Sequence, residues 1–299
     1  MGLLPWGRIF RRKTTWFSLV VLAALGLVAV LAPWIAPHDP YERFWGNTGR
    51  PPMWVQNEVK PGVAQHPLGT DLLGRDILSR LIYGTRTAFF LAFTAIPLAA
   101  LIGTLAGLAA GYAGGRTDRV ILFFTDMILS IPGIMFMVMI VLIFRNLLAP
   151  SWFNGLITLV IGFAAVSWVS LARLVRVNVL MLKAQLFVEA AISLGAPPRR
   201  IITHHLFPNV LHVILVWMIN HIPGIILLEA ILGYIGVGVT QASGGDEFTV
   251  ISWGGLFFAG RAALSRNPWI LALPSLGILL FSMSFILLAD QINEAIRGE

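Results

Sequence analysis

The sequence predicts an all-α membrane protein with six transmembrane helices and with both chain termini on the cytoplasmic side. Of its 299 residues, 57% are hydrophobic and only 12% are charged, whereas soluble domains carry about 25% charged residues. The mean hydropathy is +0.82. Long stretches without Asp, Glu, Lys or Arg recur along the chain, and roughly 20 apolar residues suffice for a helix to cross a bilayer.

Six apolar stretches follow one another, and we expect spans at about residues 16–36, 87–112, 120–144, 155–176, 209–235 and 268–289. Asp126 interrupts the third stretch and Glu229 interrupts the fifth. A cleavable signal peptide is the alternative for the first stretch, but its apolar run is longer than a usual signal core and five further stretches follow. Residues 1–15 then form a cytoplasmic tail and residues 16–299 one transmembrane domain.

The orientation follows from the basic residues that precede the first span, namely Arg8, Arg11, Arg12 and Lys13. Basic clusters stay on the cytoplasmic side, and an even number of spans returns the C-terminus to that side. Outer segments then cover residues 37–86 and 236–267, and a cytoplasmic loop covers 177–208. The net charge of +7 suits an anionic lipid surface, and no base-reading motif predicts a nucleic-acid partner.

The cytoplasmic loop has the pattern of two short helices joined by a hinge. Residues 178–194 are good helix formers, and Gly195 can end this helix in a left-handed conformation. Pro197 and Pro198 suit a turn and the first position of a second helix. We expect Pro208 to close this unit before the fifth span.

Two interpretations of the loop remain open on physical grounds. It is either an amphipathic segment that places Arg199 and Arg200 on phospholipid, or a docking surface for a cytoplasmic partner. Ala190 and Ala191 are small enough for another chain to pack closely, and Glu189 is a possible charged anchor for an arginine.

The spacing of the loop resembles the EAA loop of ABC-importer permeases. Glu189-Ala190-Ala191 is followed after three residues by Gly195 and thirteen residues later by Pro208; His205 and Phe207 depart from the family's Ile and Leu. The resemblance implies a coupling helix that seats in a groove of an ATPase subunit, with contacts from Glu189, Ala190, Ala191, Gly195, Arg199, Arg200, His205 and Pro208.

Residues 66–86, HPLGTDLLGRDILSRLIYGTR, look like the segment before the second span in C-type permeases of dipeptide and oligopeptide ABC transporters. Further matches follow at residues 111–118 and 229–254, and in the latter a polar insertion at 240–251 replaces the family's Pro-Pro segment. The resemblance implies the type I ABC importer permease fold in the inner (plasma) membrane of a prokaryote. It also implies a homologous second permease as heterodimer partner, two ATPase subunits and an extracytoplasmic substrate-binding protein. The expected substrates are peptides or similar small solutes.

Charged residues interleave with apolar ones at the end of the first outer segment, namely Asp71, Arg75, Asp76, Arg80 and Arg86. An amphipathic helix over residues 70–86 at the outer interface would explain this pattern. The resemblance offers another interpretation, in which the residues belong to an outer gate and to the docking face for the binding protein.

The chain lacks the sequence motifs of an ATPase. A P-loop requires Gly-Lys-Ser/Thr, and none of the lysines, Lys13, Lys60 and Lys183, follows a glycine. Adjacent His204 and His205 project in different directions from a helix, so we expect no metal site. The sequence therefore predicts no enzymatic activity and no cofactor on this chain, with ATP and Mg bound by the partner ATPases.

Ionisable and amide side chains within membrane spans are functional candidates. Asp126 lies near a span end and we expect it to pair with a nearby arginine. Glu229, with Asn220 and His221 upstream, belongs either to a polar pathway or to a contact between helices. The alternative function is an ion-coupled secondary transporter in which Asp126 and Glu229 carry the coupling ion.

Overall fold

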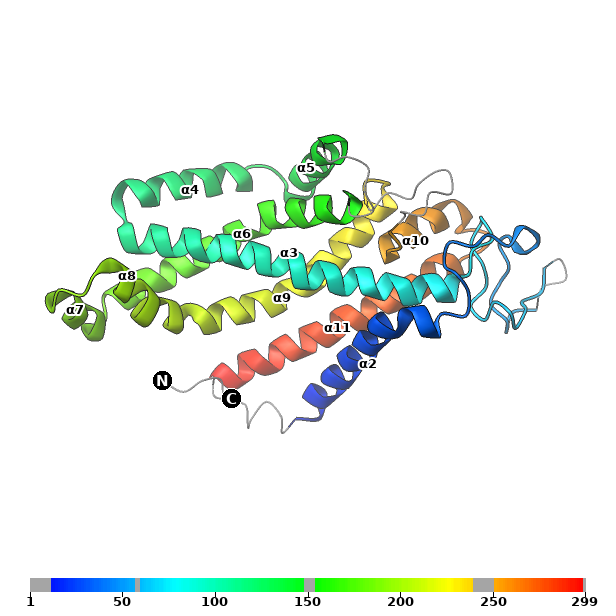
Figure 1. Cartoon of the computed structure of the whole chain (residues 1–299), viewed down its shortest axis with the longest axis horizontal. Helices are drawn as coiled ribbons and strands as arrows, with labels where there is room; N and C mark the ends of the chain where they lie inside the picture. Colours follow the sequence, from blue (N-terminus) through cyan, green and yellow to red (C-terminus); the bar gives the residue numbers. More distant parts are fainter. Residues whose placement is uncertain (1–11, 57–59, 148–153, 239–249, 298–299) are drawn as a thin grey trace.

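The computed structural model describes residues 12–56, 60–147, 154–238 and 250–297, and this part of the chain is built from helices (Figure 1). The longer helices are α2 (Lys13–Ile35), α3 (Ile77–Ala113), α4 (Gly115–Leu129), α5 (Gly133–Leu147), α6 (Asn154–Lys183), α9 (Phe207–Tyr234) and α11 (Trp269–Arg297). The short ones are η1 (Trp45–Asn47), α7 (Leu186–Ser193), α8 (Pro198–Arg200), η2 (Ile201–Leu206), α10 (Trp253–Gly260) and η3 (Arg261–Ala263). Most of the 240–251 insertion lies outside the described residues.

The number of candidate spans is compatible with the six expected, but the third differs from the helix expected over 120–144. Five helices are long and apolar enough to cross a membrane, and α4 with α5 makes a sixth candidate that bends by 92°. The break falls at Ser130–Pro132. Pro132 has no amide hydrogen to donate and its ring disfavours a helical Ile131, so the apolar run continues while the helix does not.

The second span is also longer than expected because α3 begins at Ile77 rather than near residue 87. Its far half packs on α6 (Figure 1), where Gly103, Gly107 and Gly111 recur every fourth residue. A Cβ at Gly107 would lie 2.6 Å from the Ala172 carbonyl oxygen. Small residues at this spacing let two membrane helices approach closely, so α3 and α6 form the central pair of the fold.

The loop predicted between the fourth and fifth spans needs one correction at its start. The helix expected over 178–194 is divided, because α6 continues to Lys183 and a new helix, α7, begins at Leu186. Gln185 adopts an extended conformation, and its carbonyl accepts the amides of Val188 and Glu189. Gly195 has φ +76°, which confirms its left-handed conformation.

A second correction concerns Pro208, which does not separate the loop from the fifth span. Helical structure is continuous over Pro198–Tyr234, with Pro198 at the first turn as predicted. A π-helical turn, η2, covers Ile201–Leu206 just before the proline. The wider turn changes the hydrogen-bond register just before Pro208, whose ring nitrogen has no hydrogen to donate to the preceding turn.

The start of α2 and the end of α11 lie close together, at the same end of the molecule as α7 and α8 (Figure 1). Arg12, just before α2, forms an ion pair with Glu294 of α11. Lys183 at the end of α6 donates to the Tyr112 carbonyl at the end of α3, at 2.8 Å. The connection between α2 and α3 lies at the opposite end (Figure 1). The structure thus places the start of α2, the end of α11 and residues 184–200, here called the 184–200 loop, on one side, and the assignment of that side to the cytoplasm stays a prediction.

Candidate functional site

The described residues of the segment before α3, 38–56 and 60–76, are here called the 38–76 unit and fold around buried charged groups. Asp71 is fully buried and accepts the amides of Leu73 and Arg75 at 2.9 Å and the Arg75 Nε at 2.7 Å. Arg80 is 2% exposed and donates to the Pro40 carbonyl at 3.1 Å. Burial raises the pKa of the Tyr41 phenol, and the positive charge of Arg80 partly offsets this effect. The unit therefore has a closed, weakly solvated interior.

Asp76 ties the unit to the start of α3. One carboxylate oxygen accepts the Ser79 amide at 2.7 Å and the Ser79 hydroxyl at 2.8 Å, which caps the helix. The other oxygen lies 3.0 Å from His66 Nδ1 and 3.8 Å from His38 Nδ1. Three groups of metal-ligand type thus meet within 4.8 Å, an arrangement that the sequence analysis missed because His38 lies 28 residues before His66.

The neighbours of His66 favour a hydrogen-bonded junction over a metal site. Asn47 accepts the Arg50 Nε through its Oδ1 at 2.7 Å, so its amide nitrogen faces His66 Nε2 at 3.2 Å. His66 Nε2 must then be the acceptor, and Nδ1 carries the hydrogen that it donates to Asp76. Both ring nitrogens are already used, and a metal on Nδ1 would require this network to rearrange.

Four of the five charged residues proposed for an outer docking face are buried in the described chain, namely Asp71, Arg75, Asp76 and Arg80. Arg86 is exposed, and its guanidinium carbon lies 5.8 Å from the centre of the Tyr83 ring. The amphipathic helix expected over 70–86 is therefore wrong. Residues 70–76 belong to the 38–76 unit, and residues 77–86 are the first turns of α3.

The 184–200 loop has the opposite character, because most of its side chains are exposed. Leu186 and Leu194 are 83% and 88% exposed, and Glu189, Arg199 and Arg200 are exposed as well. Val188 is the buried anchor of α7. The Phe187 ring lies 6.2 Å from the ring of His205 in η2, so the loop rests on the start of the fifth span and leaves an apolar and basic surface open.

Both carboxylates suggested for ion coupling have partners within the chain. Asp126 forms an ion pair with Arg173 of α6, which confirms the predicted arginine partner. Glu229 is 3% exposed and accepts the Gly254 amide at 3.1–3.2 Å. Since Gly254 lies in the first turn of α10, Glu229 holds the start of that helix.

Asn220 and His221 each bond to a carbonyl of their own helix, α9. Asn220 donates to the Val216 carbonyl at 2.9 Å, and His221 Nδ1 lies 2.8 Å from the Trp217 carbonyl. Asn220 is exposed and His221 is partly exposed. Both residues line a cavity of about 360 Å³ between α6, α9 and α11.

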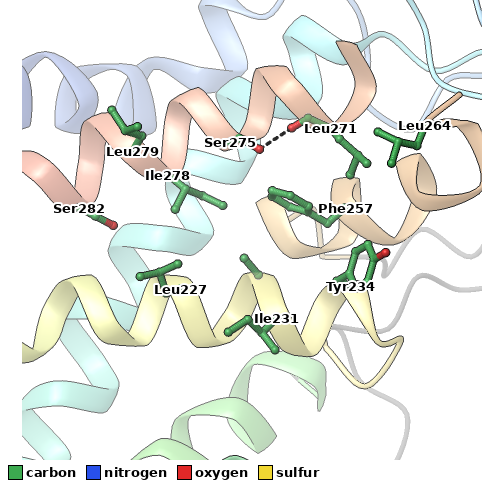
Figure 2. Close-up of a pocket in the computed structure, with 11 residues that line it drawn as sticks. Leu227, Ile231, Tyr234, Phe257, Leu264, Leu271, Ser275, Ile278, Leu279 and Ser282 are labelled. Carbon is green, nitrogen blue, oxygen red and sulfur yellow. Dashed lines mark hydrogen bonds between the residues drawn. The ribbon is translucent and has the colours of Figure 1, made fainter. Parts of the chain in front are cut away.

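A larger cavity of about 610 Å³ lies between α9, α10 and α11, and Figure 2 shows side chains of these helices converging on it. Its lining includes Leu227, Ile231, Phe257, Leu271, Ile278 and Leu279. Ser275, one of its few polar members, donates its hydroxyl to the Leu271 carbonyl at 2.7 Å. The walls are therefore apolar and offer little to a polar solute.

Comparison with known proteins agrees with this architecture. A family model for the binding-protein-dependent transport system inner membrane component matches residues 103–298. A model for the N-terminal transmembrane domain of oligopeptide transport permease C matches residues 4–52. An inward-facing structure of the MetNI methionine ABC transporter has a TM-score of 0.56 at 16% identity, covering 73% of this chain and 97% of its own. At this identity the likeness concerns the fold alone.

Curated relatives extend over nearly the whole chain. The oligopeptide transport system permease protein OppC of Haemophilus influenzae is 32% identical over 97% of this chain and 86% of its own length. The di/tripeptide transport system permease protein DppC of Pseudomonas aeruginosa is 32% identical over 97% and 90%. The glutathione transport system permease protein GsiD of Escherichia coli is 32% identical over 97% and 88%. The chain therefore belongs to the family of binding-protein-dependent transport system inner membrane components, and it is a multi-pass permease subunit of an ABC importer.

Proposed function

We propose that this permease imports peptides or similar small solutes across the inner (plasma) membrane of a prokaryote, paired with a homologous but different second permease. The substrate class rests on relatives that are named for oligopeptide, di/tripeptide and glutathione transport. Glutathione is itself a small peptide-like molecule. The solutes in all three names therefore share amide groups as their common chemistry. Alternating access of the paired subunits moves the solute, without chemistry on this chain.

Two separate ATPase subunits supply the energy in this proposal, and they bind the ATP and Mg. The observation that carries it is the open surface of the 184–200 loop, where Leu186 and Leu194 are 83% and 88% exposed. Large apolar side chains at such exposure mark an interaction site. Glu189, Ala190, Ala191 and Gly195 line this surface with the spacing of a coupling helix, and His205 and Pro208 join it to the fifth span.

An extracytoplasmic binding protein delivers the solute at the opposite end of the molecule. In this proposal the buried charges around Asp71 keep the 38–76 unit rigid from within, and Arg86 is the member of the predicted docking set that reaches the surface. A rigid support fits this role, because docking surfaces lose less conformational entropy when their backbone is already ordered.

Charge reversal in the loop tests the ATPase contact. We expect Glu189→Lys, and independently Leu194→Asp, to abolish co-purification of the ATPase subunits and peptide uptake, with the amount of membrane-inserted permease unchanged. Arg116→Glu is the matched control, because Arg116 is exposed near the same end of the molecule but outside the loop. Normal ATPase co-purification with both loop variants would contradict the proposed contact.

The same complex separates ATP-driven import from ion coupling. Uptake should stop when the ATPase subunits are removed and should persist when an uncoupler collapses the proton gradient while ATP is maintained. Uptake that needs the gradient but no ATPase would instead favour Asp126 and Glu229 as coupling groups.

A further inference from the structure

The cavity of about 360 Å³ beside the middle of α9 has a polar lining that the transport function leaves unassigned. It is lined by Leu174, His212, Val213, Val216, Trp217, Asn220, His221 and Asn293. His212 and Asn220 are exposed, and His221 and Asn293 are partly exposed. Polar side chains on the open side of a membrane helix are unfavourable against lipid. This part of the subunit therefore faces water or another protein rather than acyl chains.

The imidazole of His221 is held in one orientation and one tautomer. Its ring stacks on the Trp217 indole with centroids 4.0 Å apart, and Trp217 Nε1 donates to the Ser170 hydroxyl of α6 at 3.1 Å. His221 Nδ1 lies 2.8 Å from the Trp217 carbonyl, which can only accept, so Nδ1 carries the hydrogen. In the neutral ring Nε2 is then an acceptor, and no described residue donates to it in the structure.

Asn220 adds a second acceptor by the same reasoning. Its amide nitrogen donates to the Val216 carbonyl at 2.9 Å, which fixes the assignment of nitrogen and oxygen. The side-chain oxygen is then left on the exposed side of the helix. The cavity wall thus carries two hydrogen-bond acceptors on adjacent residues, His221 Nε2 and Asn220 Oδ1. Both can bind N–H groups from outside the subunit.

We propose that this cavity is a transient subsite that accepts N–H donors of the passing solute, above all the ammonium end of a peptide. The inference rests on the peptide-import function proposed above and deepens it. The lining residues include no carboxylate, so an ammonium group is held by hydrogen bonds without a counter-ion. Such a site orients a solute and lets it leave, as a translocation pathway requires.

The test uses the complete complex with both permeases, the ATPases and the binding protein. Two pools of short alanine peptides are compared, one with free and one with acetylated amino ends. The variants are His221→Phe, which keeps the stack on Trp217, and Asn220→Ala. For each variant the uptake rate of each pool is divided by the wild-type rate for the same pool. This ratio removes the preference of the binding protein, because the binding protein is the same in every measurement.

We expect uptake of the free-amine pool to fall by about ten-fold, as the loss of one hydrogen bond to a charged donor implies, with uptake of the acetylated pool nearly unchanged. Asn178→Ala is the matched control, because the Asn178 amide makes the same kind of bond within its own helix, to the Leu174 carbonyl of α6, and Asn178 does not line the cavity. Asn178→Ala should match the wild type in basal ATPase activity and in uptake of both pools, and all three variants should assemble like the wild type.

Two results would overturn the subsite: equal uptake of both pools at the wild-type rate, or equal loss of both pools, which would assign the residues a merely structural role. Failure of the wild-type complex to import either pool is a different result. It would overturn the peptide assignment itself and, with it, this inference.

Discussion

The 38–76 unit and the 184–200 loop are both charged connections, rich in Gly and Pro, between apolar helices, yet they fold in opposite ways. In the unit, Asp71 and Asp76 are buried and accept hydrogen bonds from backbone amides, and the buried Arg80 of α3 donates to the unit's Pro40 carbonyl. In the loop, no side-chain hydrogen bond of Glu189 or Arg200 is found among the described residues, and both are exposed. Charge in a connection therefore does not by itself mark a docking surface. The docking surface proposed for the loop rests instead on its exposed apolar side chains, Leu186 and Leu194.

The largest expected effect is at Asp71, whose removal would break the interior of the 38–76 unit. Asp71→Ala leaves the buried guanidinium groups of Arg75 and Arg80 without this carboxylate, and a broken buried charge pair costs about 3–5 kcal/mol. We expect a large drop in the thermal unfolding midpoint of the detergent-solubilised subunit and rapid proteolysis within residues 38–76. Arg86→Ala, at an exposed position, is the control and should unfold like the wild type.

A wild-type midpoint for Asp71→Ala would mean that the unit is no more self-supporting than the loop. That result would remove the contrast between the two regions, because the buried charges would then contribute nothing to the folded state.

A smaller effect is expected in the helix pair that joins the two ends. Gly107→Ala places a Cβ 2.6 Å from the Ala172 carbonyl oxygen, so α3 and α6 must separate, at a cost of about 1–3 kcal/mol. Thermal unfolding should show this loss. Gly224→Ala is the matched control in α9, since its Cβ would meet nothing within 4 Å. Equal midpoints for the two variants would show that the pair tolerates the added methyl group.

Local features of the fold could be predicted from the sequence, and tertiary ones could not. The six apolar stretches and the left-handed Gly195 depend on composition and on one residue type, so they were predicted. The break at Pro132 had a signal in the Pro-Gly pair, but the predominantly apolar composition of residues 120–144 favoured one span. The buried position of Arg80 depends on the Pro40 carbonyl, forty residues away. No periodicity in residues 70–86 reports that contact, and the same pattern fits a surface helix.

The smallest effect, and the sharpest test of the contrast, is expected at Gly195. Its φ of +76° is unfavourable for a residue with a side chain, but an added Cβ would meet nothing within 4 Å. Gly195→Ala should therefore cost about 1 kcal/mol through the backbone alone, and only within the loop, since α7 is anchored mainly by Val188. Hydrogen exchange should speed up in residues 186–200 while the global unfolding midpoint stays unchanged. Gly195→Asn should recover much of the protection, because asparagine tolerates this conformation. A fall in the global unfolding midpoint would instead show that the 184–200 loop is as integral to the fold as the 38–76 unit. The positions of Leu186 and Leu194 would then be fixed by packing of the loop on the spans.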